Sequence, residues 1–221
     1  MDYMSERESL MYQAMGAFAD AGMPLVFKGG LITKVYLIEN GLFDLTRGTV
    51  DIDATWINNQ SEPDYIVKCI DSIVKTMNTD YSAEVFRTYN GMNTTVGIAV
   101  KDHDVELFKM DLELYKPVAN ITQLTVQGKT FNCVDVKQII ADKLVVVSKP
   151  IVFRRAKDIL DLYGLTKCVV TEKKEILKII NESGRALDDF NCFIDRKDDL
   201  NHAYDRLKGV VKKPSFGVVY K

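Results

Sequence analysis

Residues 25–56 read LVFKGGLITKVYLIENGLFDLTRGTVDIDATW, and this stretch decides the fold. The apolar run at 25–27 predicts a short buried strand that stops at a Lys-Gly-Gly turn. A helix is expected to follow, because apolar residues recur at helical spacing as far as Asn40-Gly41, a typical C-terminal stop. The β-prone run at 49–56 then predicts a second strand.

Two acidic residues, Asp51 and Asp53, fall on the same face of that second strand, because side chains alternate along a strand. Adjacent carboxylates repel each other, so a fold avoids them unless a cation or a cluster of donors lies between them. The plain alternative is an exposed strand edge with solvated acids. Likewise, Gly29 and Gly30 either cap a helix or hold a phosphate with their amides. Together, the glycine turn and the Asp-x-Asp strand predict a site for phosphate and Mg²⁺.

The order of these motifs resembles the layout of a nucleotidyltransferase. The Lys-Gly-Gly turn, the string RGTVDID at 47–53 and the later string RAKDILDLY at 155–163 resemble the AbiEii/AbiGii-type toxin nucleotidyltransferases, a group that includes MenT-like toxins. The order of motifs matches over roughly residues 25–165. The resemblance implies an α+β fold with a nucleotidyltransferase-like mixed β-sheet core and flanking helices, followed by a helical C-terminal half.

Composition limits the other classes of protein. The chain has 221 residues and 47% hydrophobic content, enough for a sizeable core. No apolar run approaches the roughly 20 residues of a membrane span, and the polar N-terminus is unlike a signal peptide. The four cysteines form no Cys-x-x-Cys pair, and two histidines cannot make a His-rich metal site. We therefore expect a soluble cytoplasmic protein.

Charge is distributed unevenly along the chain. The net charge of −2 argues against a generally basic nucleic-acid binder, but acidic residues outnumber basic ones in 1–134 and the reverse holds in 135–221. An acidic half and a basic half suit a metal site and a phosphate-binding lobe, although chance surface asymmetry explains the pattern equally well. We expect a nucleotidyltransferase α/β core at 1–134 and a helical C-terminal lobe at 135–221.

The remaining hydrophobic patterns supply the other elements. They predict helices at 5–19 and 63–78, strands at 83–89, 94–101 and 105–115, a small hairpin at 124–133, then helices at 136–148, 153–163, 172–181, 187–193 and 202–211, and an irregular tail at 212–217.

Nucleotidyl transfer requires cations that bridge the nucleotide phosphates, and three carboxylates on neighbouring strands can hold two Mg²⁺ or Mn²⁺ ions. Asp51, Asp53 and Asp111 are the predicted ligands. Alternation along 105–115 puts Glu113 on the same face as Asp111, so Glu113 stays an alternative third ligand.

The resemblance also implies site residues in the helical half. The family has a Lys-Leu pair on one helix, matched by Lys143-Leu144, and a later Arg-x-Lys-Asp helix, matched at 155–158. Lys143 lies among apolar residues and must reach an anion, which is either a nucleotide phosphate or a neighbouring acid. Asp158 is its predicted functional partner. The nucleotide-binding set implied here is Gly29, Gly30, Arg47, Lys143 and Arg155, with solvent exposure the plain alternative for Arg155.

The predicted function is metal-dependent transfer of a nucleoside monophosphate from an NTP to an acceptor, with tRNA or another RNA favoured. By resemblance, the protein is the toxin of a bacterial toxin–antitoxin or abortive-infection system, and a cognate antitoxin is its partner. Two alternatives stay open: a transferase of the same fold that acts on a small molecule or a protein, and a non-catalytic nucleotide-binding module.

Overall fold

The computed structural model describes residues 4–57, 62–89, 94–114, 118–149 and 155–220. Its strands and helices confirm the predicted class, a mixed β-sheet with flanking helices followed by a helical segment. The start of the helix expected at 153–163 lies outside the described residues.

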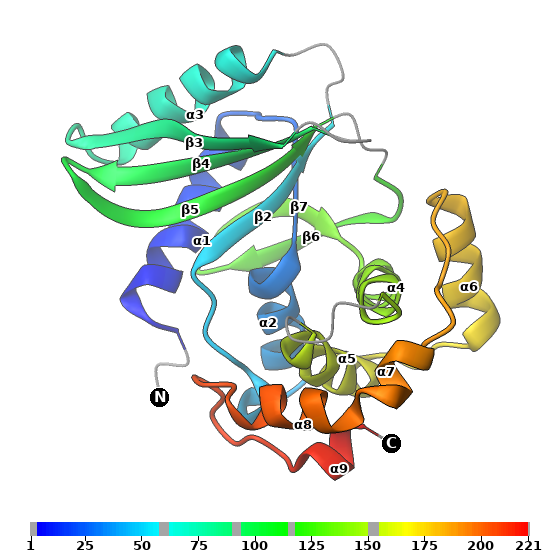
Figure 1. Cartoon of the computed structure of the whole chain (residues 1–221). Helices are drawn as coiled ribbons and strands as arrows, with labels where there is room; N and C mark the ends of the chain where they lie inside the picture. The colour runs from blue at the N-terminus through cyan, green and yellow to red at the C-terminus, as the bar shows by residue number, and fades with distance from the viewer. Residues whose placement is uncertain (1–3, 58–61, 90–93, 115–117, 150–154, 221) are drawn as a thin grey trace. The chain divides into compact units, whose positions relative to one another are not determined.

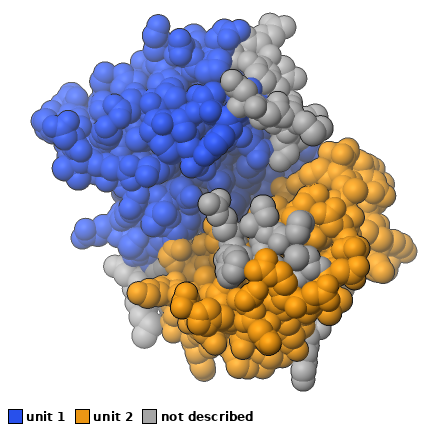
Figure 2. Space-filling model, viewed as in Figure 1, with its two compact units in different colours: residues 1–32, 49–134 blue, residues 33–48, 135–221 orange. Residues whose placement is uncertain are grey.

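The chain divides into two compact units, coloured separately in Figure 2. The first contains residues 1–32 and 49–134, and the second contains residues 33–48 and 135–221. The predicted division into domains at residue 134 stays a prediction.

The first unit is built on a mixed sheet of seven strands within the described residues, in the order β3-β4-β5-β2-β1-β7-β6 (Figure 1). The pairs β2–β5 and β1–β7 are parallel, and the other neighbouring strands are antiparallel. The strands are β1 (Leu25–Lys28), β2 (Asp51–Trp56), β3 (Tyr81–Tyr89), β4 (Thr95–Asp102), β5 (Val105–Leu114), β6 (Ile121–Val126) and β7 (Lys129–Val134).

Two helices of the first unit, α1 (Glu6–Asp20) and α3 (Pro63–Met77), pack against each other and the sheet. The α3 side chains at Ile66, Ile70 and Val74 are buried at helical spacing. Ser5 and Glu8 form a capping box at the start of α1. Glu8 is itself buried, and its Oε1 accepts a hydrogen bond from the Thr49 amide at 3.2 Å. This bond ties the first turn of α1 to the chain just before β2.

The second unit is helical. It contains the later part of α2 (Gly29–Glu39) and η1 (Phe43–Leu45), followed by α4 (Val136–Val147), α5 (Ala156–Cys168), α6 (Lys173–Glu182), α7 (Asn191–Asp195), α8 (Lys197–Asp205) and α9 (Phe216–Val219). Side chains of α5, α8 and α9, including Leu160, Leu200 and Phe216, form one buried cluster.

Three helix boundaries near the C-terminus differ from the predictions. The helix predicted at 202–211 is wrong, since α8 runs from Lys197 to Asp205 and buries Leu200 with Tyr204, four residues apart. The tail predicted as irregular becomes helical at Phe216, whose ring lies 5.6 Å from the Tyr204 ring. The helix predicted at 187–193 begins only at Asn191. Tertiary packing sets these ends.

The packing of α5 provides a test of this architecture. A Cβ added to Gly164 of α5 would lie 2.6 Å from Leu37 Cδ2. We expect Gly164→Val to lower the free energy of unfolding by about 2 kcal/mol, because the two helices would have to separate. Urea denaturation measures this change. As the control, Gly217→Ala adds a methyl group that meets no atom within 4 Å. Equal effects of the two substitutions would contradict the packing.

Candidate active site

Two of the predicted carboxylates lie side by side on neighbouring strands. In the parallel pairing of β2 with β5, Asp53 is opposite Asp111 and Asp51 is opposite Lys109. Neighbouring strands lie about 4.8 Å apart, and paired residues of parallel strands point to the same face. Asp53 and Asp111 therefore share a face with Asp51. Thr49 donates its hydroxyl to Asp51 Oδ1 at 3.2 Å.

Gly29 is required at the turn between β1 and α2 for two reasons. Its φ is +73°, a left-handed conformation that favours glycine, and a Cβ there would lie 1.9 Å from Asp53 Oδ2. The register explains this closeness, because Lys28 pairs with Asp53 across β1 and β2. The Asp53 carboxylate consequently lies at the first residue of α2, and Gly30 follows in the same turn. Backbone N–H groups of a first helical turn form an anion-binding site.

Basic side chains flank the acidic pair. Lys28 Nζ contacts Glu113 Oε2 at 2.5 Å, and Glu113 is opposite Thr55 in the β2–β5 register. Arg87 Nη2 donates to Asp111 Oδ1 and Oδ2 at 2.6 and 2.5 Å. The register thus favours Asp111 over Glu113 as the neighbour of Asp53, and the choice of third metal ligand stays a prediction.

The donor set suits a hard divalent cation, since carboxylate oxygens are the ligands that Mg²⁺ and Mn²⁺ prefer. Among the residues that the structure describes, however, no three His, Cys, Asp or Glu side chains gather closely enough to hold a metal ion. At Asp111, both carboxylate oxygens accept hydrogen bonds from Arg87. In this arrangement Arg87 occupies the carboxylate of Asp111, and the assignment of Asp51, Asp53 and Asp111 as metal ligands stays a prediction.

A buried ionic cluster lies in the second unit. Lys143 of α4 donates from Nζ to Asp158 Oδ1 at 3.0 Å and to Asp161 Oδ2 at 2.7 Å, both on α5. Arg47 forms a bidentate contact with Asp161, donating from Nε to Oδ1 at 2.9 Å and from Nη2 to Oδ2 at 2.8 Å. Arg155 Nη1 donates to Asp158 Oδ2 at 3.3 Å. The cluster therefore combines three cations with two carboxylates.

The cations determine the ionisation of this cluster. Burial raises the pKa of Asp161, but Lys143 and Arg47 outweigh that effect and lower the pKa to about 2. Burial likewise opposes the charged form of Lys143, whereas Asp161 and Asp158 raise the pKa of Lys143 above its ordinary value. Lys143 and Asp161 thus both stay charged at neutral pH.

The structure brings Lys143 together with Asp158, Arg155 and Arg47, all of which the sequence reasoning had singled out. Asp161, three residues after Asp158 on α5, contacts both Arg47 and Lys143 and is 1% exposed. The reasoning missed Arg87 altogether. One available signal was Gly97, because an isolated glycine within a strand often marks a close approach of another group.

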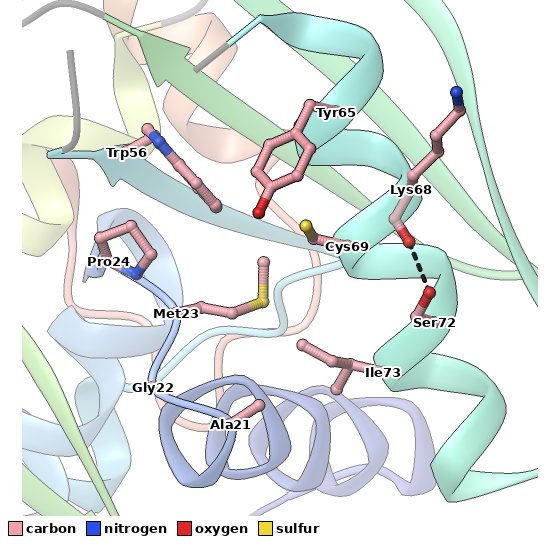
Figure 3. A pocket seen from close by; sticks show the side chains of 10 residues that line it. All are labelled: Ala21, Gly22, Met23, Pro24, Trp56, Tyr65, Lys68, Cys69, Ser72 and Ile73. Carbon is pink, nitrogen blue, oxygen red and sulfur yellow. Dashed lines mark hydrogen bonds between the residues drawn. The ribbon is translucent and has the colours of Figure 1, made fainter. Parts of the chain in front are cut away.

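The first unit also contains a cavity of about 640 Å³, whose lining side chains are drawn in Figure 3 and include none of the acidic residues above. Trp56, on the face of β2 opposite to Asp53, lines it together with Met23 and with Tyr65 and Cys69 of α3. In the figure these side chains point toward a common space, and the Lys68 ammonium points away from it. The cavity is thus not formed by the predicted site residues.

The sequence profile of the family described as Nucleotidyl transferase AbiEii toxin, Type IV TA system, matches residues 12–206. The chain belongs to this family and is a nucleotidyltransferase, which confirms the resemblance found in its motifs. No curated protein matches the sequence. In the described part of the chain, no helix has the length and apolar run needed to cross a membrane.

Solved structures share the fold at low sequence identity. The crystal structure of ANT(2'')-Ia in complex with adenylyl-2''-tobramycin has a TM-score of 0.53 and 16% identity, covering 81% of this chain and 98% of that chain. The solution structure of ANT(2'')-Ia has a TM-score of 0.51 and 16% identity, covering 90% of this chain and 97% of that chain. The structure of MenT4, a nucleotidyltransferase toxin from Mycobacterium tuberculosis, has a TM-score of 0.49 and 15% identity, covering 78% of this chain and 61% of that chain. The two ANT(2'')-Ia structures show that this chain has a nucleotidyltransferase fold.

The ionic cluster yields a prediction about stability. We expect Asp161→Asn to lower the free energy of unfolding at pH 7 by about 3 kcal/mol, because Arg47 would lose the carboxylate that it contacts and Lys143 would keep only Asp158. Folding lowers the pKa of Asp161 from 3.8 to about 2. The difference in unfolding free energy between the wild type and Asp161→Asn is therefore complete above about pH 4 and disappears as the pH falls through 2.

Urea denaturation at pH 7, 4 and 3 measures both effects. The control is Asp188→Asn, which removes a half-exposed ion pair with Lys149 at 3.3 Å and should cost less than about 1 kcal/mol. If Asp161→Asn lowers the free energy of unfolding no more than the control does, or lowers it further as the pH falls, Asp161 is not the ionised centre of this cluster.

Proposed function

We propose that this nucleotidyltransferase moves a nucleoside monophosphate from an NTP to an RNA acceptor, with tRNA favoured, as the toxin of a bacterial toxin–antitoxin system. The observation that carries the proposal is the register that sets Asp53 beside Asp111, with Gly29 packed against the Asp53 carboxylate. The same observation supports a requirement for Mg²⁺ or Mn²⁺. The family description supports the toxin role and a cognate antitoxin as partner.

The residues of the first unit have distinct tasks in this proposal. A divalent cation, when bound, neutralises the charge that develops on the transferring phosphate. Asp51 and Asp53 would hold that cation, and the amides of Gly29 and Gly30 would bind triphosphate oxygens at the first turn of α2. Asp111 completes the ligand set. The acceptor hydroxyl attacks the α-phosphorus of the NTP as the bond from that phosphorus to pyrophosphate breaks, and a neighbouring aspartate takes the hydroxyl proton as the base.

In this proposal the residues of the second unit have the roles that the sequence predicts for them. Lys143 and Arg47 supply buried positive charge of the kind that binds phosphate, and Asp158 orients the Lys143 ammonium. An ammonium has three N–H donors, and Asp158 and Asp161 accept two of them. The third can donate to a phosphate oxygen. Arg155, bonded to Asp158, adds a further positive charge. A cytoplasmic location agrees with an RNA substrate.

A second candidate differs only in the acceptor. The ANT(2'')-Ia structure that shares this fold contains adenylyl-2''-tobramycin. The same carboxylate site in this chain could therefore serve transfer to a small hydroxylated molecule. The two candidates predict different labelled products, so one assay separates them.

The assay incubates the purified protein with each α-labelled NTP, Mg²⁺ and total bacterial RNA, with tobramycin in a parallel reaction. We expect labelled RNA with one of the NTPs. Label on tobramycin alone would favour the second candidate. Absence of both labelled products and of pyrophosphate release would overturn the proposed transfer activity.

Substitution of the central carboxylate tests the residue assignment. Asp53→Asn should reduce labelling by roughly 1,000-fold or more, because loss of a bound cation removes several kcal/mol of transition-state stabilisation. The matched control, Asp104→Asn, changes an exposed carboxylate at the turn between β4 and β5 and should leave labelling intact. Full activity of folded Asp53→Asn protein would refute the assignment.

A further inference from the structure

An irregularity in the pairing of β3 with β4 places Arg87. Val85 pairs with Ile98 and Arg87 pairs with Gly97, so Phe86 is an extra residue in β3. Such a bulge redirects the side chains that follow it, and bulges are common beside active sites. Both Phe86 and Arg87 consequently approach the same residue of β4, namely Gly97.

Only a glycine at position 97 leaves room for this approach. A Cβ there would lie 2.5 Å from Arg87 Cγ and 2.8 Å from Phe86 Cζ. Gly97 is in turn opposite Asp111, which is opposite Asp53. The missing side chain on β4 therefore opens a path along which the Arg87 side chain crosses that strand and reaches the acidic pair.

The contact made at the end of this path resembles cation binding. A single nitrogen, Nη2, lies 2.6 and 2.5 Å from the two oxygens of Asp111, a position between both oxygens that a chelated metal ion would also take. The guanidinium carbon lies 4.9 Å from the Phe86 ring centroid and 5.4 Å from that of Tyr89. Within the described residues, Arg87 Nε is buried without a hydrogen-bond partner. The guanidinium thus retains a donor that Asp111 does not use.

We infer that Arg87 alternates between two partners: it holds Asp111 while the site is free, and it binds a phosphate of the NTP once a metal ion takes Asp111. This inference rests on the proposed function. A cation can reach both oxygens of Asp111 only by displacing Nη2. The displaced guanidinium carries donors in a fork that matches phosphate oxygens, and the two aromatic rings keep it near the carboxylates. Arg87 is then a substrate-binding residue that also controls metal entry.

The inference predicts opposite effects on two affinities. Arg87→Gln should tighten binding of Mn²⁺ alone by about tenfold, because a charge-assisted hydrogen bond no longer competes for Asp111. The same variant should weaken binding of a non-hydrolysable NTP in the presence of saturating Mn²⁺ by about tenfold. Titration calorimetry with Mn²⁺, and then with each of the four α,β-methylene NTPs, measures both affinities without turnover.

Gly97→Ala separates competition from simple loss of charge. This variant keeps every charge but fills the path of Arg87, so it should also tighten Mn²⁺ binding, and Arg87→Gln/Gly97→Ala should bind Mn²⁺ no more tightly than Arg87→Gln. Lys101→Gln is the control, since it removes a positive charge from the same β3–β4 hairpin, where Lys101 pairs with Glu84. It should leave both affinities unchanged.

The outcomes are distinguishable. Unchanged Mn²⁺ affinity in folded Arg87→Gln and Gly97→Ala proteins, or the same tightening in Lys101→Gln, would overturn the inference about Arg87 alone. A fall in both affinities for Arg87→Gln would likewise overturn it, since Arg87 would then merely support the site. Wild-type protein that binds neither Mn²⁺ nor any of the NTP analogues would overturn the proposed function as well.

Discussion

The parallel pairing of β2 with β5 is the constraint on which the candidate active site depends. It sets Asp53 beside Asp111 on one face of the sheet, where two carboxylates repel each other. The structure offsets this cost with Arg87 on Asp111 and with a glycine at position 29, which lets Asp53 lie against the start of α2. Under the proposed function, this crowding is what provides a binding surface for a divalent cation and phosphate oxygens.

The second unit meets a related constraint by different means. Asp161 is almost fully buried and stays ionised because Lys143 and Arg47 both contact it. Removing one member of such a cluster leaves uncompensated charge in a low-dielectric interior, so the cluster holds α4, α5 and the segment at 33–48 in one arrangement. The same residues keep Lys143 charged at neutral pH, the state that phosphate binding requires.

Local patterns in the sequence were enough to predict the strand–helix–strand stretch at 25–56, because alternation and glycine placement are short-range signals. The resemblance supplied Lys143 and Asp158. Two features could not be read in this way. The contact between Arg87 and Asp111 depends on a bulge and on the register of three strands, and Arg47 reaches Asp161 across 114 residues of sequence. The helix predicted at 202–211 was displaced, because the predicted span leaves out Leu200, which α8 buries together with Tyr204.

The most direct test of the central claim is a crystal structure of the protein with Mn²⁺ and an α,β-methylene NTP, with the metal located by anomalous scattering. The account predicts an anomalous peak at the carboxylates of Asp51 and Asp53 and triphosphate oxygens at the amides of the first turn of α2. A metal–nucleotide complex bound elsewhere, for example in the cavity beside Trp56, would contradict it.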